Sequence, residues 1–318
     1  MRATKGLLKG LNPTMAMTAL TVVTLFLLFG VFDPDTAGTW FTGAKDTIIA
    51  GFKWYYILVV ALFLFFAVYL MFSRFGSIRL GDDDQVPEFG YFAWFSMLFS
   101  AGMGIGLVFW SIAEPMYHLQ GNPFITEGMT PEAAQIAMRL TFFHWGLHPW
   151  AIYVIVGLSL AFFSYRRKLP LAIRSVLYPI LGERIYGFWG HAAAVLAVFG
   201  TVFGVATSLG LGVSQMNTGL NQMFGMEVSQ HSQLWLIGGI SLIATLSAIS
   251  GVGRGVKILS ELNIWLSAFI LALFLVLGPT TYILNAYVQN IGDYLQNIVK
   301  LRCWTNTAAN GTSAWQSS

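Results

Sequence analysis

The chain carries Ser100-Ala101-Gly102-Met103-Gly104-Ile105-Gly106 in the middle of an apolar segment, with a glycine at every second position. Each glycine weakens a helix by about 1 kcal/mol relative to alanine. A loosened backbone at membrane depth leaves its amides and carbonyls unpaired unless it lines a cavity or binds a ligand. The stretch therefore predicts a broken helix, as in transport proteins that bind ions and substrates at the bilayer midplane. A GxxxG contact of Gly102 and Gly106 with another helix is the alternative.

Composition assigns the chain to a broad class. Of its 318 residues, 56% are hydrophobic and 10% are charged, whereas a soluble domain carries about 25% charged residues. This excludes a soluble globular protein and predicts an all-α integral membrane protein surrounded by the lipid bilayer. The net charge of +3 does not indicate a nucleic-acid partner, because the basic residues are spread over loops and do not alternate with aromatic residues on a polar face.

Apolar runs long enough to cross about 30 Å of hydrocarbon predict the number of spans. The third run is longer than required and has the glycine stretch at its centre, which fits a broken or tilted helix. The first run follows Arg2, Lys5 and Lys9 without a small-residue cleavage site, so we expect a retained span and not a signal peptide. The seven predicted spans lie near 13–32, 52–72, 89–117, 137–164, 188–215, 233–251 and 262–284.

The distribution of Lys and Arg predicts the orientation of these spans. The loops after the second, fourth and sixth runs carry basic residues, whereas the loops after the first, third and fifth runs carry almost none. Because cytoplasmic loops are enriched in Lys and Arg, the N-terminus and the basic loops are predicted to be cytoplasmic. The acidic run Asp82-Asp83-Asp84 then lies in a cytoplasmic loop, where we expect a solvated connector.

The chain divides into four segments on these patterns. Residues 1–88 hold two spans and a cytoplasmic loop, residues 89–284 hold five spans, residues 285–300 are amphipathic, and residues 301–318 are polar. The amphipathic segment has one apolar and one polar helical face, which predicts a helix lying flat at the outer membrane surface. Its apolar face consists of Tyr287, Val288, Ile291, Tyr294, Leu295, Ile298 and Val299, and Asp293 belongs to the polar face.

Three aromatic residues of the fourth span suggest a binding pocket. On a continuous helix of about 100° per residue, Trp145, Trp150 and Tyr153 point into one sector about 140° wide. Pro149 interrupts the helical hydrogen bonds there and frees the carbonyl of Trp145. Such a pocket suits a quaternary ammonium group, which is held by cation–π attraction of about 2 kcal/mol or more when desolvated. Alternatively, these aromatic residues fill the bundle or lie at the membrane interface.

Two sets of ionisable residues are candidate sites. His144 and His148 have the i, i+4 spacing of metal ligands, but no cysteine accompanies them and the nearest acidic residue in sequence is Glu132. Because a metal site needs three or four ligands, no metal site is predicted. Glu114 precedes Pro115 near the outer end of the third span. It is either a functional carboxylate or a helix-end group that reaches interfacial water.

The fifth span offers hydroxyl groups at Thr201, Thr207 and Ser208. These oxygens could bind a hard cation such as sodium, or they could bond to the carbonyl four residues earlier. The sequence contains no nucleophile elbow, phosphate-binding loop or zinc-protease helix, so neither an enzyme nor an organic cofactor is predicted.

Six short motifs occur in a fixed order along the chain. They are Gly102-Met-Gly-Ile-Gly106, Ala113-Glu-Pro115, Phe143-His-Trp145 with Trp150 and Tyr153, Arg174-Ser-Val-Leu-Tyr-Pro179, Ala206-Thr-Ser-Leu-Gly-Leu-Gly212 and Leu259-Ser-Glu-Leu-Asn263. In this order they resemble the betaine/choline/carnitine transporter family. The resemblance covers nearly the whole chain and implies a leucine-transporter-like fold with two inverted repeats of five helices. Residues 89–284 would form the first repeat, helices 3–7, after two N-terminal helices.

The resemblance also implies site residues. The broken span would bind the substrate and the coupling ion, and the fourth span would contribute part of an aromatic box with a gating phenylalanine beside it. The implied substrate-binding residues are Trp145, Trp150, Tyr153, Gly102, Met103, Gly104, Gly106 and Phe109. The implied sodium ligands are the carbonyls of Ser100 and Met103 and the hydroxyl of Thr201.

Two positions bear on the substrate and the ion. Val205 stands where sodium-coupled members have a second threonine, and its apolar side chain cannot bind sodium. Gly106 stands where a related choline branch has an aspartate. The glycine at this position favours betaine over choline as the substrate.

The function that the resemblance implies is osmoprotective, secondary active import of a quaternary-ammonium osmolyte, glycine betaine or choline. It would be coupled to sodium or protons in the bacterial cytoplasmic (inner) membrane, by a homotrimer at full length. The chain ends at Trp315-Gln-Ser-Ser318, where span eight of the family would begin. We therefore expect an N-terminal fragment that is inactive alone. The alternatives are a channel or osmosensor, a membrane scaffold, and a transporter of another zwitterionic or anionic osmolyte on the same scaffold.

Overall fold

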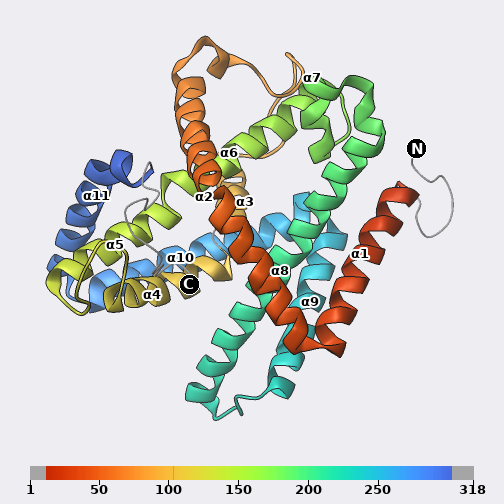
Figure 1. Cartoon of the computed structure of the whole chain (residues 1–318). Coiled ribbons are helices and arrows are strands. Elements are labelled where there is room, and N and C mark those ends of the chain that lie inside the picture. Colours follow the sequence, from red (N-terminus) through yellow and green to blue (C-terminus); the bar gives the residue numbers. More distant parts are fainter. Residues whose placement is uncertain (1–11, 103, 303–318) are drawn as a thin grey trace. The chain divides into compact units, whose positions relative to one another are not determined.

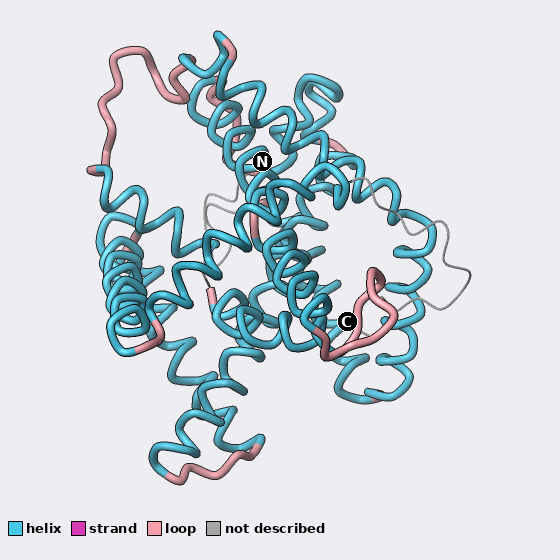
Figure 2. The backbone as a smooth tube through the Cα atoms, turned by 90° about the vertical axis from the view of Figure 1, so that its left-hand side faces the viewer, coloured by secondary structure: helices cyan, strands magenta, loops and turns pink. Residues whose placement is uncertain are grey.

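The computed structural model of the chain describes residues 12–102 and 104–302. These residues form helices joined by short loops, and no strand occurs among them (Figure 2). Within these described ranges, six helices are long and apolar enough to span a membrane, or seven when one bent pair counts as a single span. The predicted all-α membrane class is therefore confirmed. The described residues form two compact units, one of residues 12–85, 147–204 and 300–302, the other of residues 86–102, 104–146 and 205–299.

In the first unit, two long helices are joined by a single residue. Asp33 ends one helix and caps the next, because its carboxylate accepts a hydrogen bond from the amide of Thr36 at 3.2 Å. Pro34 follows in the first position of the new helix, where no N–H is needed. The chain therefore makes a sharp corner at Asp33 (Figure 1). The two helices are α1 (Pro13–Phe32) and α2 (Pro34–Phe72).

The first predicted span matches α1, but the second was predicted too short. Helix α2 begins at Pro34 and not near residue 52, because residues 35–51 contain no further proline and continue the helix. The remaining elements of the first unit are η1 (Arg74–Ser77), α6 (Leu147–Ala161), η2 (Phe162–Arg166), η3 (Ile173–Leu177), α7 (Tyr178–Leu181), η4 (Gly182–Tyr186) and the first part of α8 (Phe188–Phe224).

The acidic run after α2 is exposed, as predicted for a solvated connector, and two of its carboxylates also form ion pairs. Asp82 pairs with Lys168 at 2.7 Å, and Asp83 pairs with Arg166 at 2.5 Å. The hydrogen bond from Arg166 holds the pKa of the Asp83 carboxyl below its ordinary value. The side chain of Asp83 is 83% exposed, and pairs of this kind contribute little to stability. Their effect is to join the loop after α2 to the loop after α6.

The second unit contains the broken span. Helix α3 (Tyr91–Gly102) ends inside the glycine stretch, and α4 (Ile105–Gln120) begins three residues later. Gly104 caps α4 in an extended conformation, with φ −84° and ψ −171°. The two helices are bent by 49°, so the predicted break is confirmed. Met103 lies outside the described residues.

The fourth predicted span is also interrupted, but at a different residue from the one predicted. Helix α5 (Pro131–Trp145) ends before Gly146, and α6 begins at Leu147. Pro149 lies in the first turn of α6, where a missing N–H costs little. A Cβ at Gly146 would collide with the carbonyl oxygen of Phe142 and lie 2.9 Å from the hydroxyl of Tyr294. Gly146 therefore allows the close packing at the end of α5.

The second unit is completed by helices that follow α8. Gly278 and Pro279 end the seventh span at residue 277, earlier than predicted, because proline cannot continue the preceding helix. The amphipathic segment predicted at 285–300 lies inside the last helix of the unit. These elements are α9 (Gln230–Ser250), η5 (Val252–Val256), α10 (Lys257–Leu277) and α11 (Thr280–Arg302).

Helix α11 packs on α5 through its Asp293 and Tyr294. Tyr294 is 5% exposed, and its ring lies 6.2 Å from that of Phe142. Asp293 binds Arg139 through two hydrogen bonds of 2.6 and 2.7 Å. The side of α11 that packs on α5 therefore includes Asp293 from the predicted polar face and Tyr294 from the predicted apolar face. The apolar residues Val288, Leu295 and Val299 stay exposed, and the membrane-surface position of this helix stays a prediction.

Candidate functional site

The second unit brings Trp145 to the helix that follows the glycine break. Helices α4 and α5 contact each other, and Trp145 is the last residue of α5. A Cβ at Gly106 would lie 3.7 Å from Cη2 of the Trp145 ring. Gly104 has no such neighbour, since nothing lies within 4 Å of a Cβ built there. Two of the predicted site residues, Gly106 and Trp145, therefore lie next to each other, with room for a methyl group at Gly106.

Glu114 fixes the indole of Trp145. Nε1 of Trp145 donates to Oε2 of Glu114 at 2.5 Å, and Glu114 is 7% exposed. The interpretation of Glu114 as a helix-end group that reaches water is therefore wrong. Pro115 and Glu114 lie inside α4, so the carboxylate is carried by regular helix and not by a loop.

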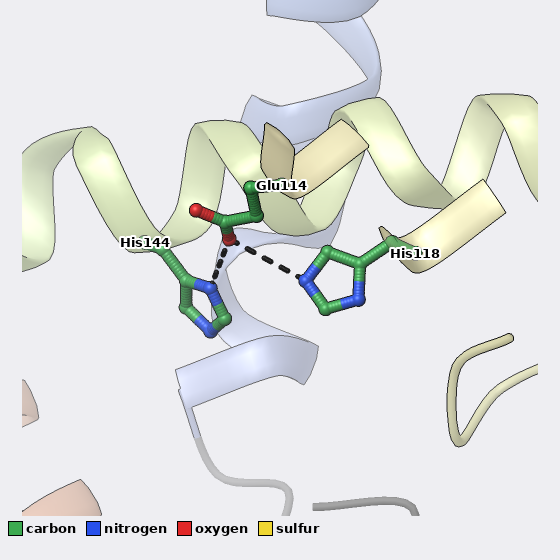
Figure 3. A group of neighbouring side chains, drawn as sticks. All are labelled: Glu114, His118 and His144. Carbon is green, nitrogen blue, oxygen red and sulfur yellow. Dashed lines mark hydrogen bonds and ion pairs between the residues drawn. The ribbon is translucent and has the colours of Figure 1, made fainter. Parts of the chain in front are cut away.

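The second oxygen of this carboxylate contacts two histidines (Figure 3). Oε1 of Glu114 is hydrogen-bonded to Nδ1 of His144, and Nε2 of His118 lies 3.4 Å from the same oxygen. His118 is 8% exposed. The pairing of His144 with His148 considered from the sequence required a continuous helix, but the helix is interrupted at Gly146 between them.

His118 was missed by the sequence reasoning, although a signal was present. It follows Glu114 by four residues, which places both side chains on one face of α4. The third member, His144, comes from α5, and its proximity depends on how α4 and α5 pack. Sequence spacing alone does not provide that information.

Ser100, near the end of α3, is held by α10. Nδ2 of Asn263 donates to Oγ of Ser100 at 3.1 Å, and this hydroxyl donates to the carbonyl of Ser260 at 3.4 Å. These bonds attach the last turn before the glycine break to a neighbouring helix. The sequence reasoning did not predict this contact of Asn263 with Ser100.

The other predicted aromatic residues belong to other parts of the chain. Trp150 and Tyr153 lie on α6 in the first unit, with their ring centroids 5.7 Å apart. Trp145 was placed in one sector with Trp150 and Tyr153 on the assumption of a continuous helix, but the helix is interrupted at Gly146. The aromatic box of these three residues therefore stays a prediction. Phe109 lies on α4, where its ring is 5.2 Å from that of Trp110.

The predicted cation ligands are placed as follows. The hydroxyl of Thr201 donates to the carbonyl of Ala197 at 2.8 Å, which is the intrahelical bond expected as the alternative to cation binding. Val205, one turn later, is 61% exposed. Thr201 and Ser100 belong to different units, and Met103 is outside the described residues. A sodium site formed by these residues stays a prediction.

The comparisons with known proteins agree on one family. A family model described as BCCT, betaine/carnitine/choline family transporter, matches residues 14–318. The chain is 48% identical over 287 residues to the glycine betaine transporter OpuD of Bacillus subtilis, covering 90% of this chain and 55% of that protein.

Two further relatives are named as transporters of glycine betaine and of choline. The chain is 43% identical over 291 residues to a probable glycine betaine transporter of Desulfitobacterium hafniense, covering 92% of this chain and 58% of that protein. It is 43% identical over 289 residues to the high-affinity choline transport protein of Escherichia coli, covering 91% of this chain and 42% of that protein. The chain thus spans about half the length of the curated relatives it matches.

Proposed function

Because the chain belongs to the betaine/carnitine/choline transporter family, we propose that its spans take part in secondary active import of a quaternary-ammonium osmolyte, glycine betaine or choline. The observation that carries this proposal is Trp145, held by Glu114 beside Gly106 at the glycine break. Family membership and six apolar helices make the chain a multi-pass membrane protein. Its proposed location is the bacterial cytoplasmic membrane, with the N-terminus in the cytoplasm.

The chemistry of Trp145 supports a cationic substrate. A quaternary ammonium group has no proton to donate, so a site recognises it by shape and by the negative faces of aromatic rings. The hydrogen bond to Glu114 uses the edge of the indole and leaves the π system intact. We propose that Trp150, Tyr153 and Phe109 complete the aromatic surroundings of the substrate.

The glycine break is proposed to supply the backbone part of the site. Gly102 ends α3 and Gly104 begins the cap of α4, so the chain leaves helical geometry where carbonyl and amide groups can face a ligand. The proposed coupling ion is sodium or a proton. Ser100, Met103 and Thr201 are the proposed sodium ligands. The apolar side chain of Val205 cannot bind sodium, which favours coupling to protons.

The proposal is tested by uptake of radiolabelled glycine betaine and choline in cells expressing the gene as it stands at its chromosomal locus. We expect saturable uptake, with each of the two compounds inhibiting the uptake of the other. Replacing sodium with potassium abolishes uptake if Ser100, Met103 and Thr201 bind sodium, whereas a protonophore abolishes it if protons are coupled. Conductance that does not saturate with substrate would contradict a carrier and favour a channel.

The size of residue 106 gives a separate prediction. Gly106→Leu is expected to reduce uptake at least about tenfold, because a branched side chain would displace the Trp145 ring from its place and 1.4 kcal/mol corresponds to about tenfold. Gly106→Ala keeps most uptake, since its Cβ makes an ordinary contact at 3.7 Å. Gly239→Ala, on α9, is the matched control, since nothing lies within 4 Å of a Cβ built there. Equal uptake by Gly106→Leu and the native protein would show that Trp145 need not occupy this position.

A further inference from the structure

Three side chains that could bind a metal ion meet between α4 and α5. Oε1 of Glu114, a ring nitrogen of His118 and a ring nitrogen of His144 all lie within 4.8 Å of one another. Figure 3 shows both imidazoles directed at the carboxylate from two different helices. Among the described residues, it is the one group of three or more His, Cys, Asp or Glu side chains whose ligand atoms lie this close together.

The spacing of these atoms suits a small tetrahedral ion. Zinc lies about 2.0–2.2 Å from nitrogen and oxygen ligands, which places two ligands of a tetrahedron about 3.4 Å apart. Nε2 of His118 and Oε1 of Glu114 are 3.4 Å apart. Nδ1 of His144 is closer, within a hydrogen bond, so its ring would move outward as an ion takes the place of the bridging proton.

The surroundings of the carboxylate also resemble those of a metal ligand. Metal-binding carboxylates are oriented by hydrogen bonds from neighbouring groups. Here Nε1 of Trp145 donates to Oε2 of Glu114 at 2.5 Å, which leaves Oε1 directed at the two imidazoles. Glu114 and His118 are buried, whereas the side chain of His144 is 32% exposed. An ion could therefore enter past His144.

We propose that Glu114, His118 and His144 form a binding site for Zn²⁺ or a chemically similar divalent ion. Two imidazoles and one carboxylate favour late first-row metals, whereas Mg²⁺ and Ca²⁺ prefer sites made of oxygen ligands alone. The site is separate from the proposed sodium ligands, which are carbonyl and hydroxyl oxygens. It needs no contribution from the osmolyte, so it can be tested whether or not the transport proposal holds.

Direct binding to the purified, detergent-solubilised protein tests this proposal. We expect one Zn²⁺ per chain by titration calorimetry, and visible absorption bands of tetrahedral Co²⁺ when cobalt replaces zinc. His118→Ala and His144→Ala are each expected to weaken zinc binding by roughly tenfold or more. Removing a group that only hydrogen-bonds to a metal ligand already lowers metal affinity by about that factor, and removing a ligand itself should lower it further. Both variants retain the hydrogen bond between Trp145 and Glu114.

A matched variant and a milder substitution complete the test. His231 is exposed and lies outside the cluster, so His231→Ala is expected to bind zinc as the native protein does. If His118→Ala does not fold, His118→Gln keeps a polar side chain without an imidazole ligand. The proposal is overturned if the native protein binds no zinc, or if its affinity is unchanged when His118 or His144 is replaced. Neither result affects the expected uptake of glycine betaine.

Discussion

Replacing Trp145 with leucine is expected to lower the uptake of glycine betaine or choline by roughly 30-fold, the equivalent of about 2 kcal/mol of cation–π attraction. The change removes the aromatic face beside the glycine break. It also removes the donor to Oε2 of Glu114, and a buried acceptor without its partner costs about 1–3 kcal/mol. The loss should therefore exceed that caused by replacing an aromatic residue that only fills space.

Two variants separate the roles of this tryptophan. Trp145→Phe keeps an aromatic face but has no N–H for Glu114, so its uptake should lie between those of the native protein and Trp145→Leu. Trp189 is 65% exposed, and Trp189→Leu serves as the control. Initial uptake rates are measured over a range of substrate concentrations and corrected for the amount of protein in the membrane. Native rates and native affinity in Trp145→Leu would exclude this residue from the substrate site.

Breaking the pair between Arg139 and Asp293 is expected to have the largest effect on stability. The guanidinium donates Nε to Oδ2 at 2.6 Å and Nη2 to Oδ1 at 2.7 Å. The two side chains are 18% and 10% exposed, so removing one partner leaves a charge in a poorly solvated place. Arg139→Ala or Asp293→Asn should therefore destabilise the fold by about 3–5 kcal/mol.

Protein stability in detergent and protease sensitivity of α11 measure this effect. The double variant Arg139→Met with Asp293→Leu leaves no unpaired charge, so it should recover much of the lost stability. Lys45 and Asp46 provide the exposed comparison, with a separation of 3.6 Å and side chains 47% and 38% exposed. Lys45→Ala should change little. If Arg139→Ala unfolds like the native protein, the pair does not attach α11 to α5.

Local sequence features were sufficient to predict the helical architecture. The apolar runs correspond to the helices that can cross a membrane, with differences at their ends. Asp33 and Pro34 show why the ends differ, because one cap joined α1 directly to α2 where the hydropathy pattern indicated a loop. The glycine stretch correctly predicted a break between α3 and α4, since helix propensity is a property of the residues themselves.

The partners of the polar side chains were harder to predict. Asp293 was assigned to the polar face of an isolated helix, yet it binds Arg139. Asp82 and Asp83 are solvated as expected, but their basic partners Lys168 and Arg166 were not predicted. A hydrophobic pattern gives the rotation of one helix about its own axis, but it does not give the register of the neighbouring helix.

The sequence by itself determined that this chain is an α-helical membrane protein of one transporter family, with a helix broken at Gly102–Gly106. These properties depend on hydrocarbon solvation, helix propensity and the order of short motifs, which are all local along the chain. Only the tertiary structure decided that Glu114 binds Trp145, His118 and His144. That cluster depends on the packing of α4 against α5, and on an interruption at Gly146 that separates His144 from the histidine four residues later.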